Sequence, residues 1–489
     1  MNHLTQLKTV VSPRLIMLVS FAFTSIINYA FGIAIGWLVI PSDFGLFAFV
    51  QTLVLLGALV LNAGFAWSLT TSIAGATPLQ RPLLIRGAII QNVVLAGILS
   101  LSVVFAFALG PLQNGLETWS IVVLVTLSMP FLAVVSVEMA TMRGLERFGE
   151  LAFLRIFEMA CKAAGGLLLV SVGYGIQGAV AGFLIGAVLA SCVGGWRVNK
   201  LVEMRVRGQV AFPPMSITIN VFSSLVGLAF LLNLDIVALK LFTDDERELT
   251  GFYQAAIVLA NTSYYVATAL FDVLLPKLTK SKDAHQQLLV LSETLRVILI
   301  FLVPINIVLT LEPVAVLALI FPASYIASAE PLRILAIGNI FLILTAMFVT
   351  FFNAVGRSTL AAKVILTLVT LEVVLLNVFV PRYFALGAAG VFTCTSIVAT
   401  SVLGLVFSLN VERKWLWTGI SWLFRYLITA SLAAISLVGL FYSTKSIIVA
   451  VLVTIPCYFL VLLLLRVLTL PNWVAVRIHL PKHIQIHQD

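Results

Sequence analysis

The sequence predicts an all-α polytopic membrane protein with about fourteen transmembrane helices, and both its composition and the length of its apolar runs predict this class. Of the 489 residues, 61% are hydrophobic and only 10% are charged, whereas an ordinary soluble domain carries about 25% charged residues. A soluble interior cannot hold so many apolar side chains, so lipid must be the solvent for most of them. The runs stay apolar for roughly 20 residues instead of alternating with a period of two, so they are helices rather than barrel strands.

Polar residues, prolines and glycines divide the chain into the expected spans. These are 13–39, 45–70, 86–109, 118–142, 150–173, 176–197, 215–241, 251–276, 288–310, 330–355, 359–381, 386–410, 420–441 and 446–467. Residues 311–329 are apolar but interrupted and too short to cross, so we expect a periplasmic or re-entrant connection there. The first run is too long for a signal-peptide core and has no clear cleavage site after it, so we expect it to be retained as a span.

The basic residues of the loops give the orientation. With a cytoplasmic N-terminus, twenty of the loop Lys and Arg residues fall on the cytoplasmic side and five on the other. Loops rich in Lys and Arg stay in the cytoplasm, so the sequence predicts that both termini are cytoplasmic. The bias also supports the number of spans, because one missed helix would invert every later loop.

Composition excludes several classes of function. The net charge of +9 is explained by cytoplasmic loops that face anionic membrane lipids, so we expect no nucleic-acid partner. The four cysteines lie inside apolar runs without paired or metal-ligand spacing, and the five histidines avoid the spans. We therefore expect no metal site, no cofactor and no catalytic residues. No loop is long enough to form an extramembrane domain.

An internal repeat is visible at a spacing of about 206–214 residues. The matching positions are 44–47 with 250–253, 143–144 with 356–357, and 178–182 with 387–390. They mark the same places in the second and eighth, fourth and tenth, and sixth and twelfth spans. The repeat predicts two six-helix lobes, 1–212 and 213–412, followed by a terminal helix pair and cytoplasmic tail, 413–489. Repeated halves around a midplane site are a transporter architecture.

Short segments near the span ends carry a further pattern. They are Pro-Ser-Asp-Phe-Gly at 41–45, Arg-Gly-Leu-Glu-Arg-Phe at 143–148, Asn-Leu-Asp at 233–235, Gly-Phe-Tyr-Gln-Ala-Ala at 251–256, Leu-Pro at 275–276, and 321–335. Together they resemble the Wzx-type polysaccharide flippases of the multidrug/oligosaccharidyl-lipid/polysaccharide (MOP) exporter superfamily, and the similarity covers essentially the whole chain.

The resemblance implies two MATE-like lobes around a cavity that opens alternately to either side of a bacterial inner membrane. It implies a flippase that moves an undecaprenyl-pyrophosphate-linked oligosaccharide from the cytoplasmic to the periplasmic leaflet, for exopolysaccharide, O-antigen or capsule synthesis. The expected partners are this lipid-linked oligosaccharide and the membrane lipids. H⁺ or Na⁺, and the polymerase and chain-length proteins of the same pathway, are further candidates.

Basic side chains inside the spans are the candidate substrate-binding residues, because each costs roughly 2.5–3.5 kcal/mol on insertion scales and so needs a purpose or a partner. A diphosphate in a low-dielectric cavity needs cations, which Lys162, Arg296, Arg155 and Lys363 can supply. Arg155, Glu158 and Lys162 share one helix face. This face lines the cavity, or Glu158 and Lys162 neutralise each other within the helix. Arg296 and Lys363 reach the cavity or extend to the cytoplasmic interface.

Acidic side chains in the spans are candidates for cation coupling or for packing. They are Asp235, Glu158, Glu372 and Asp272. An intramembrane carboxylate can bind Na⁺ or shuttle a proton, or it can fix helix packing through a hydrogen bond or an ion pair.

Two other readings remain open at the level of sequence. One, in the same superfamily, is a cation-coupled drug antiporter or a flippase for the peptidoglycan precursor, lipid II. A drug antiporter for cationic compounds would prefer an acidic cavity. The other is a membrane glycan polymerase or transferase, which should have a sizeable extramembrane loop with clustered acids, His or Arg. The acidic loop 244–248 is short and lacks a sugar-nucleotide metal motif in a cytoplasmic setting, so we expect that the protein is not an enzyme.

Overall fold

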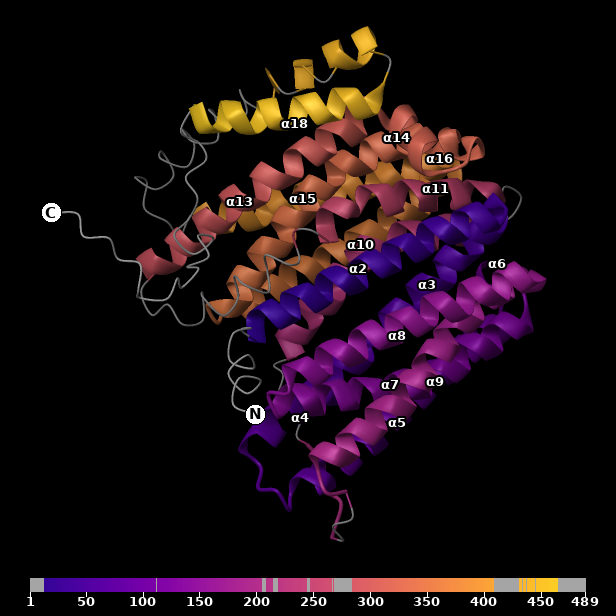
Figure 1. Ribbon diagram of the computed structural model, residues 1–489, viewed down its shortest axis with the longest axis vertical. Coiled ribbons are helices and arrows are strands. Elements are labelled where there is room, and N and C mark those ends of the chain that lie inside the picture. Colours follow the sequence, from indigo (N-terminus) through magenta and orange to yellow (C-terminus); the bar gives the residue numbers. More distant parts are fainter. Residues whose placement is uncertain are drawn as a thin grey trace, which may run out of the picture.

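The computed structural model shows a bundle of long helices (Figure 1). It describes residues 13–110, 112–204, 208–213, 219–243, 247–265, 267, 284–408, 431–432, 434–436, 438–444 and 446–464. The helices are α2 (Pro13–Leu38), α3 (Pro41–Leu61), η2 (Asn62–Ala66), α4 (Trp67–Gly75), α5 (Arg81–Ala108), α6 (Gln113–Leu116), α7 (Trp119–Gly144), α8 (Phe148–Leu169), η3 (Val170–Tyr174), α9 (Gly175–Leu201), α10 (Ile219–Phe242), α11 (Arg247–Ala260), α13 (Ala284–Leu311), α14 (Pro313–Ile320), η4 (Ala323–Ser328), α15 (Ala329–Ala354), α16 (Ser358–Ser408) and α18 (Ile447–Leu464).

Nine helical segments among the described residues are long and apolar enough to cross a membrane. The predicted fold class, an all-α polytopic membrane protein, is therefore confirmed. The number fourteen stays a prediction, because the expected spans 251–276 and 420–441 lie partly outside the described residues.

Two of the nine segments are each long enough for two crossings. Residues 148–201 and 358–408 form runs of 54 and 51 residues, whereas about 20 residues cross a bilayer. The first run is broken at Gly173 (φ 101°, ψ 9°) and Gly175 (φ 53°, ψ −139°), and the second is broken at Phe384 (φ 49°, ψ −128°). The breaks fall where the sequence predicts a boundary between two spans, and Gly175 and Phe384 have nearly the same dihedral angles 209 residues apart.

The corner after α7 is repeated after α15. Arg147 and Arg357 each donate their backbone N–H to the carbonyl group five residues earlier, at 2.8 Å in both corners. The residue before each arginine, Glu146 or Gly356, has a positive φ of 57° or 80°. This C-terminal cap gives hydrogen-bond partners to carbonyl groups at the helix end that would otherwise have none. The structure therefore pairs Arg147, rather than Arg143, with Arg357, which corrects the register of one of the three sequence matches.

The helices separate into two lobes (Figure 1). Helices α3–α9 pack among themselves on one side with α2 along α8, and helices α10–α16 pack on the other. Within the second lobe, the short helices α14 and η4 occupy the segment expected to be a connection, 311–329. Helix α18 lies on the outer edge of this lobe, where the hydroxyl of Tyr458 donates to the carbonyl oxygen of Ile300 at 3.1 Å.

Helices α2 and α3 of the first lobe meet α10 and α11 of the second along the boundary. Glycines allow the closest approach. A Cβ on Gly45 would lie 2.7 Å from the backbone nitrogen of Gly251, and a Cβ on Gly251 would overlap the carbonyl oxygen of Pro41. The predicted repeat partners 45 and 251 therefore face each other across the lobe boundary, at the N-terminal ends of α3 and α11.

Candidate functional site

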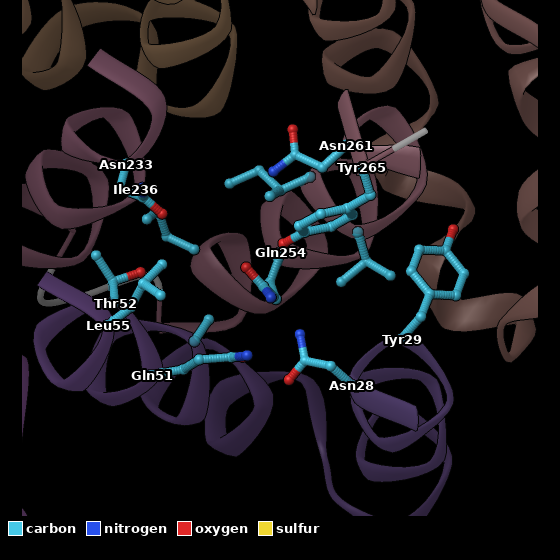
Figure 2. A pocket seen from close by; sticks show the side chains of 14 residues that line it. Asn28, Tyr29, Gln51, Thr52, Leu55, Asn233, Ile236, Gln254, Asn261 and Tyr265 are labelled. Carbon is cyan, nitrogen blue, oxygen red and sulfur yellow. The ribbon is translucent and has the colours of Figure 1, made fainter. Parts of the chain in front are cut away.

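Two adjoining pockets lie where the lobes meet. The first, of about 60 Å³, is lined by residues from α2 and α3 on one side and from α10 and α11 on the other (Figure 2). The second, of about 350 Å³, extends into the N-terminal lobe between α2, α3, α8 and α9. Four residues, Asn28, Gln51, Leu55 and Tyr265, line both pockets. The two pockets are therefore neighbouring parts of one hollow, which we call the central hollow.

Lys162 of α8 lies in the wall of the second pocket and is only 9% exposed. Its Nζ donates to Oδ1 of Asn28 at 2.9 Å. It also lies 4.6 Å from the ring centre of Phe183 and 5.4 Å from that of Phe31, which are cation–π distances. An ammonium group has three N–H donors. Lys162 thus uses one of them within the described part of the chain, and its charge faces a hollow.

The glycine pattern that opens α9 explains how this lysine is accommodated. A Cβ on Gly182 would lie 2.6 Å from the backbone oxygen of Lys162, and a Cβ on Gly186 would lie 2.9 Å from its Cβ. Only glycine therefore lets α9 pack so close to α8 at this level, as in small-residue contacts between membrane helices generally.

Glu158, one turn before Lys162, lines the same pocket. Its carboxyl group interacts electrostatically with Lys162 and with Arg155. The two alternatives for the helix face that carries Glu158 and Lys162 are therefore compatible: both residues line the hollow, and they also interact electrostatically with each other. Arg155 is half-buried on the same helix and lines neither pocket.

The remaining basic candidates lie elsewhere. Arg296 is half-buried on α13, and Lys363 is exposed on α16. Neither residue is among those that line the two pockets of the central hollow. The structure therefore brings one of the four basic candidates, Lys162, to the hollow together with Glu158.

Two acidic candidates meet inside the C-terminal lobe. Asp235 of α10 and Glu372 of α16 are 1% and 0% exposed and interact electrostatically. The hydroxyl of Tyr253 donates to Oδ2 of Asp235 at 2.6 Å, and the hydroxyl of Thr395 donates to Oε1 of Glu372 at 3.5 Å. The other oxygen of Glu372 is buried and has no hydrogen-bond partner in the described structure. Asp272 lies outside the described residues.

Sequence reasoning missed the carboxamides at the hollow. Asn28, Gln51, Asn233, Gln254 and Asn261 all line the pocket between the lobes (Figure 2). Two of them, Asn233 and Gln254, stand in segments that the sequence analysis singled out, but a neutral amide in an apolar helix is far less costly than a charge and attracts no comment. They come from different helices of the two lobes, so no pattern along the sequence groups them, and only the packing of the lobes brings them together.

Sequence reasoning also missed Glu138 of α7. This carboxyl group is 4% exposed, and Oε2 has no hydrogen-bond partner in the described structure. It lies against Gly194 of α9 and away from the central hollow.

One end of the lobe boundary is held closed by polar and aromatic contacts. Nζ of Lys240 lies 2.6 Å from a carboxylate oxygen of Glu117 in the opposite lobe. The indole N–H of Trp37 donates to the carbonyl oxygen of Ile320 at 2.8 Å. Phe44 packs against rings of α14–η4, including that of Tyr325 at 5.8 Å between centres. The glycine contact between α3 and α11 lies at this same end, which the sequence predicts to be periplasmic.

Comparisons with known proteins agree with this arrangement. Residues 36–330 match the family described as "Polysaccharide biosynthesis protein". No curated protein matches the sequence. Among solved structures, the lipid II flippase MurJ in an inward closed conformation superposes with a TM-score of 0.72 at 14% identity, covering 92% of this chain and 98% of that one.

Two MATE transporters show the same likeness. An inward-facing MATE family transporter of the MOP superfamily gives a TM-score of 0.59 at 14% identity, with 81% of this chain and 98% of that chain covered. The eukaryotic MATE transporter AtDTX14 gives 0.57 at 13% identity, with 83% and 99% covered. At these identities the likeness establishes a shared fold.

Proposed function

The chain belongs to the family of polysaccharide biosynthesis proteins and has the fold of the MOP flippases and exporters, and we propose that it translocates an undecaprenyl-pyrophosphate-linked oligosaccharide. The cargo moves from the cytoplasmic to the periplasmic leaflet of a bacterial inner membrane. The observation that carries this proposal is a buried lysine, Lys162, that faces a hollow between two matched lobes.

The charge of the hollow favours an anionic cargo. A diphosphate loses its hydration when it leaves water, and an ammonium group with free donors offsets part of that loss through charge-assisted hydrogen bonds. Lys162 has such donors and already touches the hollow. A drug antiporter for cationic compounds would place an unpaired acid there, whereas Glu158 is countered by the neighbouring Lys162 and Arg155.

The boundary contacts support alternating access. Among the described residues, the contacts that close this end include one ion pair, one indole hydrogen bond, the ring packing of Phe44 and a glycine-to-glycine approach. Such a set can separate as rigid lobes rock against each other around a central site. The predicted lobe limits of 1–212 and 213–412, the terminal pair 413–489, and the cytoplasmic termini remain part of this proposal, as do contacts with polymerase and chain-length proteins.

Replacement of Lys162 tests the proposed cargo. In proteoliposomes, a fluorescent short-chain prenyl diphosphate that carries a sugar becomes inaccessible to an impermeant quencher when it is flipped. We expect Lys162→Ala to reduce the initial rate of flipping at least about tenfold, because one charge-assisted hydrogen bond contributes roughly 1.5–3 kcal/mol.

The matched control is Lys200→Ala. Lys200 lies at the exposed end of α9, stacked on Trp196, and away from the hollow. Both variants must insert and unfold like the wild type. Flipping by Lys162→Ala at the wild-type rate would contradict the proposal that a buried cation receives the diphosphate.

We propose further that the carboxyl pair of the C-terminal lobe couples flipping to Na⁺ or H⁺. Asp235 and Glu372 are buried, lie in electrostatic contact, and leave one oxygen of Glu372 without a hydrogen bond in the described structure. Two buried carboxyl groups that interact in a low-dielectric region cannot both be ionised without a bound cation, so one of them holds a proton or both share a cation. The packing alternative remains the hydrogen bond from Tyr253 to Asp235.

Gradient dependence separates these roles. We expect an inward or outward gradient of Na⁺ or H⁺ to change the rate of flipping by the wild type several-fold, and the rate of Asp235→Asn to be the same with and without either gradient. Glu330→Gln is the control, because Glu330 forms an exposed ion pair with Arg333. A gradient response of wild-type size in Asp235→Asn would show that this carboxyl group serves packing alone.

A further inference from the structure

The two pockets of the central hollow differ in the charge of the side chains that line them. The second pocket contains the ionic pair Glu158 and Lys162. The pocket between the lobes is lined, among the described residues, by no charged side chain at all. Its polar side chains are carboxamides, the hydroxyl of Thr52 and the phenols of Tyr29 and Tyr265. A diphosphate is therefore matched by one part of the hollow and a neutral polar group by the other.

The carboxamides present unused hydrogen-bonding groups. Gln254 of α11 is 8% exposed, and its side chain makes no hydrogen bond within the described part of the chain. Gln51 of α3 is half-buried, and its side chain likewise makes no hydrogen bond within the described part of the chain. Buried polar groups without partners cost roughly 1–3 kcal/mol each, so such groups in a cavity wall point to an occupant. Each carboxamide offers two N–H donors and an acceptor oxygen.

Two asparagines add oriented donors. Oδ1 of Asn28 accepts from Lys162, and Oδ1 of Asn261 accepts from Asn339 at 3.1 Å. Both bonds use the oxygen and leave the NH₂ group. Figure 2 shows the NH₂ group of Asn28 and the ends of Gln254 and Gln51 directed toward the same space, with Asn261 on the other side of Tyr265.

We propose that Gln51, Gln254 and the NH₂ groups of Asn28 and Asn261 form the subsite for the sugar bonded directly to the diphosphate. This inference rests on the proposed function. Sugar hydroxyl and acetamido groups are neutral and act as both donors and acceptors, which is the chemistry of these carboxamides. The first sugar is the part of the cargo one bond away from the diphosphate, and Asn28 and Gln51 line both pockets.

The proposed subsite is formed by residues of both lobes. Asn28 and Gln51 belong to the N-terminal lobe, and Gln254 and Asn261 belong to the C-terminal lobe. A sugar held by both sets links the lobes. Because the pocket is lined from both lobes, a sugar bound there is contacted by both lobes when they approach each other.

Binding of defined prenyl diphosphates to the purified full-length protein tests the subsite. The probes are farnesyl diphosphate and the same compound linked to glucose, galactose or N-acetylglucosamine. We expect the wild type to bind at least one sugar-bearing probe about tenfold more tightly than farnesyl diphosphate, as two or more added hydrogen bonds would give. In Gln254→Met and in Gln51→Leu, this preference falls to about twofold or less, because the affinity for the sugar-bearing probe falls more than the affinity for farnesyl diphosphate.

Gln91→Leu is the matched control, since Gln91 lies on α5 and lines neither pocket. It should keep the wild-type preference. The subsite is wrong if the wild type prefers none of the three sugars, or if both glutamine variants keep the preference. Failure of the proposed function gives a different result: the wild type does not bind farnesyl diphosphate, or Lys162→Ala binds it equally well.

Discussion

At Lys162 a full positive charge is held within an apolar lobe by one amide oxygen and two aromatic faces. Insertion scales put the cost of such a charge at roughly 2.5–3.5 kcal/mol, and each cation–π contact returns about 0.5–2 kcal/mol. With the hydrogen bond to Asn28 and the attraction of Glu158, these contacts offset the insertion cost. The charged side chain is therefore tolerated at the hollow without a bound anion, and it keeps N–H donors that an anion can accept from.

Charged candidates were partly accessible from sequence because their cost inside a span marks them. The energetic cost of a charge inside a span points to four residues that the structure places at a hollow or in a buried cluster, namely Lys162, Glu158, Asp235 and Glu372. This cost did not separate Lys162 from Arg296, because spacing along one helix says nothing about which face the other helices cover. Neutral carboxamides carry too little cost to be noticed before the lobes are packed together.

Glu138 gives a prediction about stability at the residue scale. A Cβ on Gly194 would overlap Oε2 of Glu138 and lie 3.0 Å from Leu154. We expect Gly194→Ala to destabilise the protein by about 1–3 kcal/mol, seen as a lower Tm in detergent, because overpacking forces neighbouring side chains out of place.

The second change to make is Glu138→Ala, which removes the overlapping carboxyl group. The double variant should have a higher Tm than Gly194→Ala alone. Gly97→Ala provides the reference, because nothing lies within 4 Å of a Cβ at this position of α5. An unchanged Tm in Gly194→Ala would mean that α7 and α9 are less closely packed than described.

At the scale of the helices, the sequence predicted the boundaries between two spans but not an interruption inside a single span. The boundaries near Gly175 and Phe384 were predicted from glycine, proline and polar residues, and both are real breaks in the helix axis. The interruption between α3 and α4 at Gly64 (φ −80°, ψ −123°) was missed. It lies inside one continuous apolar run, so the hydrophobicity of the sequence does not show that the regular helical conformation is interrupted there.

The contact between α3 and α11 gives a prediction at this scale. We expect Gly251→Ala to keep the lobes apart at this end, because a methyl group there would overlap the carbonyl oxygen of Pro41. Spin labels at the exposed positions Ile40 and Phe242 should report longer distances than in the wild-type background, and flipping should be largely lost.

Gly390→Ala is the comparison within the same lobe. A Cβ there has nothing within 4 Å, so distances and flipping should match the wild type. If Gly251→Ala leaves the distance distribution unchanged, the glycine approach does not limit closure, and the ion pair, the indole hydrogen bond and the ring contacts at this end would have to account for it.

For the whole molecule, the hydrophobic content of the sequence and the length of its apolar runs predict the fold class. The internal repeat predicts two lobes, but the structure was needed to align the two copies of the repeat correctly. Matching positions were visible near Gly45 and Gly251, and the structure shows that they also touch across the boundary. No periodicity in one sequence indicates that two repeats face each other through their glycines. The hollow between the lobes, and the division of its walls into ionic and neutral parts, exist only after this docking.

The central claim concerns where the diphosphate lies, and a structure of the full-length protein in lipid nanodiscs with a bound prenyl-diphosphate sugar tests it most directly. The account predicts diphosphate density about 3 Å from Nζ of Lys162, with both lobes lining the surrounding space. Density for the diphosphate at another site, with Lys162 still bonded only to Asn28, would contradict it.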